Sequence, residues 1–78
     1  MSGQPRVVLV GREGCHLCDD ARAVVAQVCQ GLGVTWAERD VDSPGLARYS
    51  ELVPVVLVDG VDHAHFRVDP DRLREALR

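Results

Sequence analysis

Apolar positions in the first half of the chain change from a short run to a helical spacing and back. Val7–Val10 is a continuous, mostly β-branched run closed by Gly11, as expected for a strand buried on both faces. From about Cys15 to Gly31 the apolar residues recur at helical intervals, which predicts an amphipathic helix. Val34–Val41 then predicts a second strand. The inward arc of that helix comprises Leu17, Ala21, Val24, Val25, Val28 and Leu32.

The middle of the chain carries a helix-start signal and a proline that opens a strand. Asp42-Ser43-Pro44 supplies an oxygen cap followed by a proline, which predicts a short helix from Pro44 to about Tyr49. Pro54 then precedes the apolar run Val55–Val58. Because a proline is tolerated at the start of a strand, this run is expected to be the third strand.

The end of the chain predicts a hairpin and a last helix. Asp59-Gly60 is a strong signal for a two-residue hairpin turn. A fourth strand is therefore expected from Val61 to about Val68, with Phe66 on its inward face. Asp69-Pro70 has the cap and proline of a helix start, and the helix that follows is expected to bury Leu73.

The predicted order of elements is β-α-β-α-β-β-α, an α/β class. The first two strands are expected to be parallel with a right-handed crossover, and the last two to form an antiparallel hairpin. This predicts a mixed four-stranded sheet flanked by helices. A length of 78 residues suits one domain and no more, with residues 1–5 as a short disordered N-terminus.

Composition and charge exclude several classes of function. The net charge of −3 argues against a nucleic-acid partner, and no apolar run approaches the length of a membrane span. All nine basic residues are arginine, so a lysine nucleophile or Schiff base is excluded. The N-terminus lacks a secretory signal, which predicts a cytoplasmic protein. Three cysteines, an odd number, do not suit a disulfide scaffold.

Cys15-His16-Leu17-Cys18 is the main chemical signal in the chain, at the turn from a strand into a helix. Free amide N–H groups and the helix dipole stabilise a thiolate at Cys15, which is then a nucleophile toward disulfides. Cys18 follows about one helical turn later and can reach back to resolve a mixed disulfide. Arg12 and His16 add positive charge beside the pair.

Metal binding is the alternative use of such a cysteine pair. A closed zinc site needs four ligands, and Cys29 lies about three helical turns beyond Cys18, too far to share a metal with it. Cys29 is therefore expected to be a buried, inert thiol, and His63 and His65 to face solvent on an edge strand. Soft thiolates also suit Cu(I), so a copper carrier is a further alternative. Small copper carriers, however, end on a strand, and this chain is expected to end on a helix.

Several features together resemble the thioredoxin fold. These are a strand followed by Gly14-Cys15-His16-Leu17-Cys18, and Val53-Pro54 before a strand–Asp-Gly–strand hairpin. The short form resembles the glutaredoxins, and the final Asp69-Pro70-Asp71-x-Leu73 helix is most similar to small bacterial glutaredoxin-like proteins. The resemblance covers residues 6–78. It implies a thiol–disulfide oxidoreductase active in cell redox homeostasis, or else a non-catalytic binding module with the same fold.

The resemblance also implies roles for individual residues. Cys15 is the attacking thiolate and Cys18 the resolving thiol. Pro54 is a cis-proline that faces the pair, and the backbone of Val53 binds the substrate. Apart from the resemblance, Arg12 and His16 are predicted to bind substrate, because of their charge and their place beside the pair. The implied partners of this monomer are protein or small-molecule disulfides and a reducing thiol or reductase, with no resident cofactor or metal.

Two departures from glutaredoxins bear on the co-substrate. Glutaredoxins have a Gly-Gly pair after the fourth strand, where the carboxylate of glutathione is held. This chain has Phe66-Arg67-Val68-Asp69 in that region, which argues against glutathione as the reducing thiol. His16-Leu17 also replaces the Pro-Tyr that glutaredoxins carry between the two cysteines.

Overall fold

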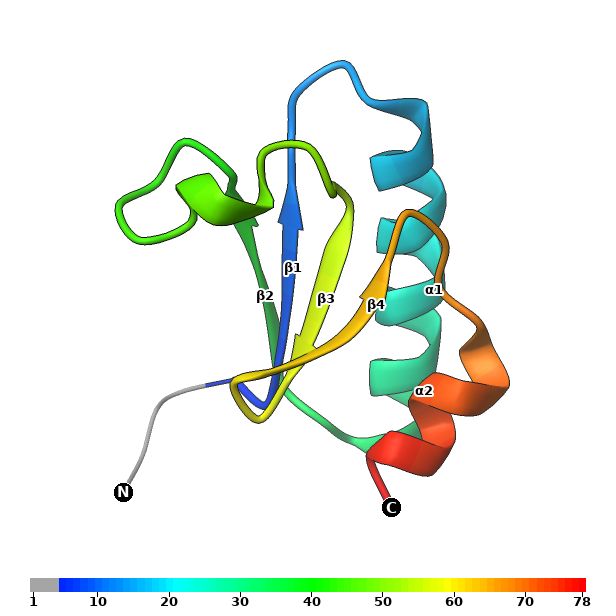
Figure 1. The fold of residues 1–78 in the computed structure, drawn as a ribbon. Helices are drawn as coiled ribbons and strands as arrows, with labels where there is room; N and C mark the ends of the chain where they lie inside the picture. The colour runs from blue at the N-terminus through cyan, green and yellow to red at the C-terminus, as the bar shows by residue number, and fades with distance from the viewer. Residues whose placement is uncertain (1–4) are drawn as a thin grey trace.

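The elements expected from the sequence occur in the expected order, with one change. A computed structural model of the chain describes residues 5–78 (Figure 1), so the disordered N-terminus expected over residues 1–5 lies almost wholly outside the described residues. The second helix is only a 3₁₀ turn, η1. The elements are β1 (Val7–Gly11), α1 (His16–Leu32), β2 (Trp36–Asp40), η1 (Ala47–Tyr49), β3 (Val55–Val58), β4 (Val61–His65) and α2 (Pro70–Ala76).

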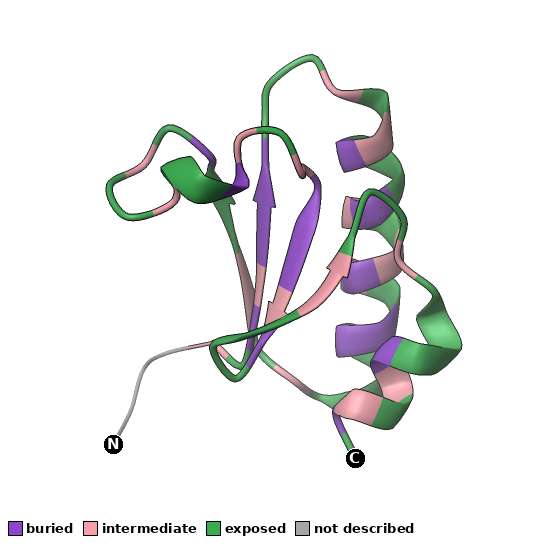
Figure 2. Cartoon of the chain, in the orientation of Figure 1, coloured by how far each residue is buried: buried purple, intermediate pink, exposed green. Residues whose placement is uncertain are grey.

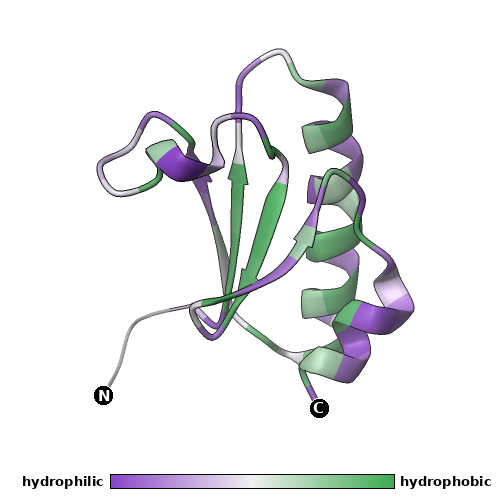
Figure 3. Ribbon diagram, in the orientation of Figure 1, coloured by the Kyte–Doolittle hydropathy of each residue, from purple (hydrophilic) through white to green (hydrophobic). Residues whose placement is uncertain are grey.

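The four strands form one mixed sheet in the order β2-β1-β3-β4. β1 pairs with β2 in parallel and with β3 antiparallel, and β3 and β4 form the antiparallel hairpin. The predicted mixed four-stranded sheet is confirmed. The hydrophobic residues gather in the central strands β1 and β3, while the edge strand β2 is mostly polar (Figure 3). This distribution explains why only the central strands are continuous apolar runs.

One face of the sheet carries the main core. α1 and α2 both lie on this face, and the buried segments of α1 lie on its side next to the sheet (Figure 2). Cys29 belongs to this core and is fully buried, as expected for an inert thiol. Among the residues that fill this core are Val7, Leu9, Val56 and Val58 from the sheet, and Ala21, Val25, Val28, Leu73 and Leu77 from the helical side.

The other face of the sheet holds a smaller core of Val10, Val41, Tyr49 and Val55. The Tyr49 hydroxyl donates a hydrogen bond to Asp62 Oδ1 at 2.8 Å and accepts one from Arg48 Nη2 at 2.9 Å. These bonds satisfy the one polar atom of a buried aromatic side chain and attach η1 to β4. The segment before the third strand is thereby fixed against the sheet.

The predicted helix from Pro44 to Tyr49 is wrong over its first half. The Leu46 N–H donates to the Ser43 carbonyl at 3.2 Å, and Gly45 has φ +87°. Proline followed by a glycine with positive φ is the pattern of a type II turn. The turn replaces the helix start, and only Ala47–Tyr49 remains helical. The second strand is also shorter than Val34–Val41, at Trp36–Asp40.

The fourth strand ends at His65, earlier than the expected Val68. An irregularity in the β3–β4 register lies between Val56 and Leu57, and Phe66 adopts φ +66°. Ala64 still packs against the main core, so it is the positive φ of Phe66 that breaks the alternation on which its inward position was predicted. Its side chain is 47% exposed. The last helix agrees with prediction, since Asp69 caps it and Leu73 is buried.

Within residues 5–78, no helix is both long enough and apolar enough to cross a membrane.

Candidate active site

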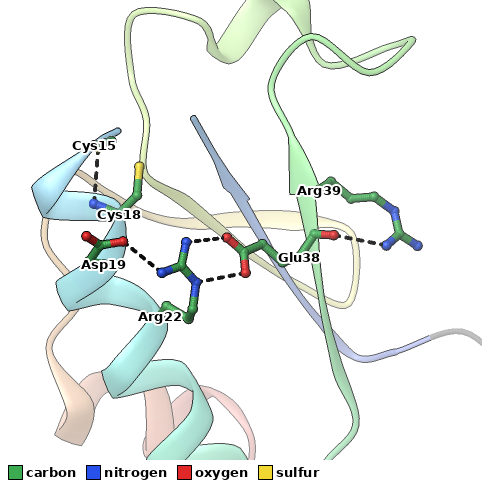
Figure 4. A network of polar contacts seen from close by, with 6 residues as sticks. All are labelled: Cys15, Cys18, Asp19, Arg22, Glu38 and Arg39. Atoms are coloured by element: carbon green, nitrogen blue, oxygen red, sulfur yellow. Dashed lines mark hydrogen bonds and ion pairs between the residues drawn. The ribbon is translucent and has the colours of Figure 1, made fainter. Parts of the chain in front are cut away.

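Cys15 and Cys18 lie where the central strand β1 passes into α1. Cys15 is the N-cap residue of α1, with extended backbone angles, and its Sγ accepts a hydrogen bond from the Cys18 N–H at 3.1 Å (Figure 4). The sulfur thus occupies the position that an oxygen side chain usually takes at a helix start. A negative charge on this sulfur is favoured by that N–H and by the positive end of the helix dipole.

The two cysteines differ in access to solvent. Cys15 is partly exposed, whereas Cys18 is fully buried behind it. Burial, followed by the hydrogen bond with Cys15, raises the pKa of Cys18 from its ordinary value of 9.0 to about 11. Cys18 is therefore a protonated thiol at neutral pH, and Cys15 is the sulfur that an incoming molecule can reach.

Gly11 lies directly against Cys18, and Pro54 lies beside Gly11. A Cβ atom on Gly11 would lie 3.2 Å from Cys18 Sγ, so the absence of a side chain there makes room for the buried thiol. Val10 pairs with Val55, and this register places Pro54 beside Gly11 at the same end of the sheet. The Val53-Pro54 peptide bond is cis, as the resemblance implies.

Two glycine substitutions are expected to change the free energy of unfolding in opposite directions, because Gly11 packs against Cys18 and Gly31 has open space around it. Gly11→Ala is expected to lower the free energy of unfolding by about 1–3 kcal/mol, because the new methyl group presses on a buried sulfur. Gly31→Ala, in α1 with open space around its Cα, is expected to raise it by about 0.5–1 kcal/mol. Urea denaturation of the reduced variants measures both values.

The cause of the Gly11 effect can be isolated by removing the sulfur. In a Cys18→Ala background, Gly11→Ala is expected to cost much less, because the atom that it meets is gone. An equal cost in both backgrounds would contradict the contact as the cause.

The four residues expected at the substrate-binding rim are placed differently from one another. Arg12 is exposed, and its Nη2 donates to the Ser50 carbonyl at 2.9 Å, which ties the loop before α1 to the segment after η1. His16 is exposed at the start of α1. Val53 is half-buried and Pro54 fully buried. Their part in binding substrate stays a prediction.

A network of charged residues beside the cysteines was not predicted. Arg22 on α1 makes two hydrogen bonds to the Glu38 carboxylate on β2, at 2.9 and 2.7 Å, and a third to Asp19 at 2.7 Å (Figure 4). The guanidinium also acts on Cys18 and lowers its pKa, partly opposing burial. The i, i+3 spacing of Asp19 and Arg22 is visible in the sequence. The pairing of Arg22 with Glu38 depends on the β1–β2 register, and the sequence does not show it.

A small cavity of about 90 Å³ adjoins the site on the other side of α1. Its walls are Leu17 and neighbouring residues of α1, and Phe66, Arg67 and Val68 after β4. This is the region in which the resemblance expects a Gly-Gly pair. Phe66, Arg67 and Val68 occupy that region here, and the expectation that glutathione does not bind stays a prediction.

Over the described part of the chain, no group of three or more histidine, cysteine and acidic side chains is arranged to hold a metal ion. Cys29 lies in the main core. On β4, His65 is exposed as expected, whereas His63 is half-buried.

Known proteins are similar to this chain in sequence and in overall fold. The model of the family described as "Glutaredoxin-like domain (DUF836)" matches residues 6–78. This chain belongs to that glutaredoxin-like family. Two relatives, uncharacterized proteins Rv0508 of Mycobacterium tuberculosis and Mb0520 of Mycobacterium bovis, are each 37% identical. Each match spans 91% of this chain and 80% of the relative.

Solved structures place this glutaredoxin-like chain among the thioredoxin-fold proteins. A structural-genomics target from X. campestris has a TM-score of 0.70 at 27% identity and covers 91% of this chain and 93% of its own. A glutaredoxin from Archaeoglobus fulgidus has a TM-score of 0.63 at 20% identity, over 97% and 89% of the two chains. At that identity, the second likeness supports the fold alone. The predicted thioredoxin-like fold is confirmed.

Proposed function

We propose that this glutaredoxin-like protein is a thiol–disulfide oxidoreductase that works through Cys15 and Cys18. The observation that carries the proposal is the division between the two sulfurs. One is partly exposed and accepts a backbone N–H at a helix N-terminus, and the other is buried directly behind it. A pair that only held the fold together would not need one sulfur at the surface.

The reaction proceeds by two exchanges of sulfur. The Cys15 thiolate attacks a substrate disulfide, so a bond forms between Cys15 and one substrate sulfur while the other substrate thiolate leaves. Cys18 then loses its proton and attacks Cys15 Sγ, which releases the second substrate thiolate. In forming the Cys15–Cys18 disulfide, the two thiols have given two electrons to the substrate. A low-molecular-weight thiol or a reductase returns them.

Substrate binding is proposed to involve the rim around Cys15. The backbone of Val53, next to the cis bond, can pair with an extended substrate segment, and Arg12 and His16 supply positive charge nearby. No resident cofactor or metal takes part. A cytoplasmic setting, in which thiols are kept reduced, suits this chemistry, and the protein is proposed to act as a monomer.

The direct test is the product of mild oxidation. We expect one disulfide, between Cys15 and Cys18, with Cys29 remaining a free thiol. Alkylation, digestion and mass spectrometry of the oxidised protein identify the linkage. Free thiols at both positions, together with one metal ion bound per chain, would replace this proposal with the metal carrier.

A second measurement separates catalysis from simple binding. Repeated reduction of a disulfide substrate in the presence of excess reductant is expected from an oxidoreductase. A Cys15–Cys18 disulfide that forms once and is never turned over would indicate the non-catalytic binding module.

A further inference from the structure

A second and larger cavity, of about 390 Å³, lies between β4 and the start of α2. We call it the 63–72 pocket. None of the residues of the proposed active site lines it. Its lining comprises His63, Ala64, His65, Arg67, Asp69 and Arg72. The volume lies within the range of sites that hold small molecules, roughly 300–1,000 Å³.

The lining is basic in a protein that is acidic as a whole. Two arginines and two histidines line the cavity, together with a single acidic residue. The net charge of the chain is −3, so the molecule in general repels anions. A local excess of positive charge in a concave surface raises the concentration of anions at that point.

The two arginines of the pocket have no acidic partner within residues 5–78. Arg6, Arg22 and Arg74 each form an ion pair of 2.7–2.9 Å with a carboxylate. Arg67 and Arg72 form none, and their guanidiniums make no hydrogen bond within the described residues. Their hydrogen-bond donors are therefore available to a ligand.

The two carboxylates near the pocket are already engaged. Asp69 Oδ1 accepts the backbone N–H groups of Asp71 at 2.8 Å and Arg72 at 3.3 Å, as the cap of α2. Asp62 accepts the Tyr49 hydroxyl at 2.8 Å and lies 3.9 Å from His65 Nε2. Within residues 5–78, neither carboxylate forms an ion pair with Arg67 or Arg72.

The backbone after β4 is turned in a way that builds this pocket. The Arg67 N–H donates to the His65 carbonyl at 2.7 Å, which closes a three-residue turn around Phe66. Phe66 has φ +66°, a conformation that a bulky residue rarely adopts and that costs about 1–3 kcal/mol. The turn brings Arg67 back to the edge that carries the histidines. Strain of this kind gathers at functional sites.

We propose that the 63–72 pocket binds a small molecule with at least two acidic groups, phosphate or carboxylate. Guanidinium groups match both anions in shape, because two parallel N–H donors meet two oxygens. Arg67 and Arg72 supply these donors, and His63 and His65 add donors at the open edge. The site is distinct from the cysteine pair and does not depend on its chemistry.

Titration of the full-length reduced protein with inorganic pyrophosphate, followed by proton NMR of the histidine rings, tests the proposal. The chain has three histidines, of which His63 and His65 line the pocket and His16 does not. We expect the first two signals to shift in a saturable way and the third to stay in place. Equal shifts at all three, or no saturable shift, would overturn the proposal.

A matched pair of double variants separates the pocket from general charge attraction. Arg67→Ala/Arg72→Ala is expected to weaken pyrophosphate binding by roughly tenfold or more. Arg39→Ala/Arg78→Ala removes the same charge from residues that do not line the pocket, and is expected to change binding by less than about twofold. The same loss in both double variants would count against the site.

Competing ligands identify the acidic group. Stronger binding of pyrophosphate than of citrate would assign the pocket to phosphate groups, and the reverse order would assign it to carboxylates. A peptide of glutamates that binds more tightly than either small anion would show that the pocket serves an acidic protein segment, and would overturn the assignment to a small molecule.

Discussion

The Cys15→Ser variant is expected to reduce disulfide substrates at least about a thousandfold more slowly than the wild-type protein. Cys15 is the partly exposed sulfur of the pair, and the first exchange begins with its attack. A serine hydroxyl keeps the hydrogen bond to the Cys18 N–H but does not ionise near neutral pH and cannot exchange with a disulfide. The assay is stopped-flow release of a coloured thiolate from a chromogenic aromatic disulfide.

Two further cysteine variants make this result specific. Cys18→Ser is expected to release one equivalent of coloured thiolate and to retain the other as a mixed disulfide on Cys15, visible as added mass. Cys29→Ser is the control. This thiol is buried in the main core, so the variant is expected to release both equivalents as the wild-type protein does. Wild-type turnover by Cys15→Ser would contradict the assignment of the nucleophile.

The cysteine pair was predictable because its chemistry is local. The spacing of Cys15 and Cys18 and the helical pattern after them place one sulfur at a helix start and the other one turn later. The cis bond at Pro54 is different. Such bonds are a small minority of X-Pro bonds, about 5–6% in folded proteins, so only the resemblance to a family pointed to it.

The errors in the predicted fold arose where one residue overrides a regular pattern. Gly45, with positive φ, converts a helix start into a turn, although the preceding cap and proline favour a helix. The positive φ of Phe66 ends the fourth strand early, and the irregularity opposite Val56 and Leu57 inserts a residue within it. Period-two alternation cannot reveal an inserted residue, because the bulge changes which residues share a face.

The sequence did not reveal two features, the charged network beside the cysteines and the 63–72 pocket, because both depend on contacts between distant elements. Arg22 meets Glu38 only because β2 pairs with β1 in parallel and α1 covers that edge. The 63–72 pocket depends on the turn at Phe66, which brings Arg67 near the histidines of β4. In the sequence these residues appear as ordinary surface charges.

The second exchange, in which Cys18 attacks the mixed disulfide, is expected to be strongly accelerated by alkaline pH. Burial is the largest cause of the raised Cys18 pKa, and it persists when Cys15 carries a substrate sulfur. The pKa is therefore expected to stay raised, and at pH values below this pKa the thiolate fraction rises about tenfold for each pH unit. From roughly pH 7 to pH 9 the rate of the second release of coloured thiolate is expected to rise about a hundredfold.

The same stopped-flow trace supplies the comparison, because the first release depends on Cys15 and the second on Cys18. Cys29→Ser is expected to reproduce the wild-type profile of the second phase, while Cys18→Ser lacks that phase at every pH. A second phase that bends near pH 8.5 and levels off at about pH 9 would mean that Cys18 ionises as an ordinary thiol. Its burial behind Cys15 would then not control the resolving step, and the proposed division of labour between the two sulfurs would fail at this point.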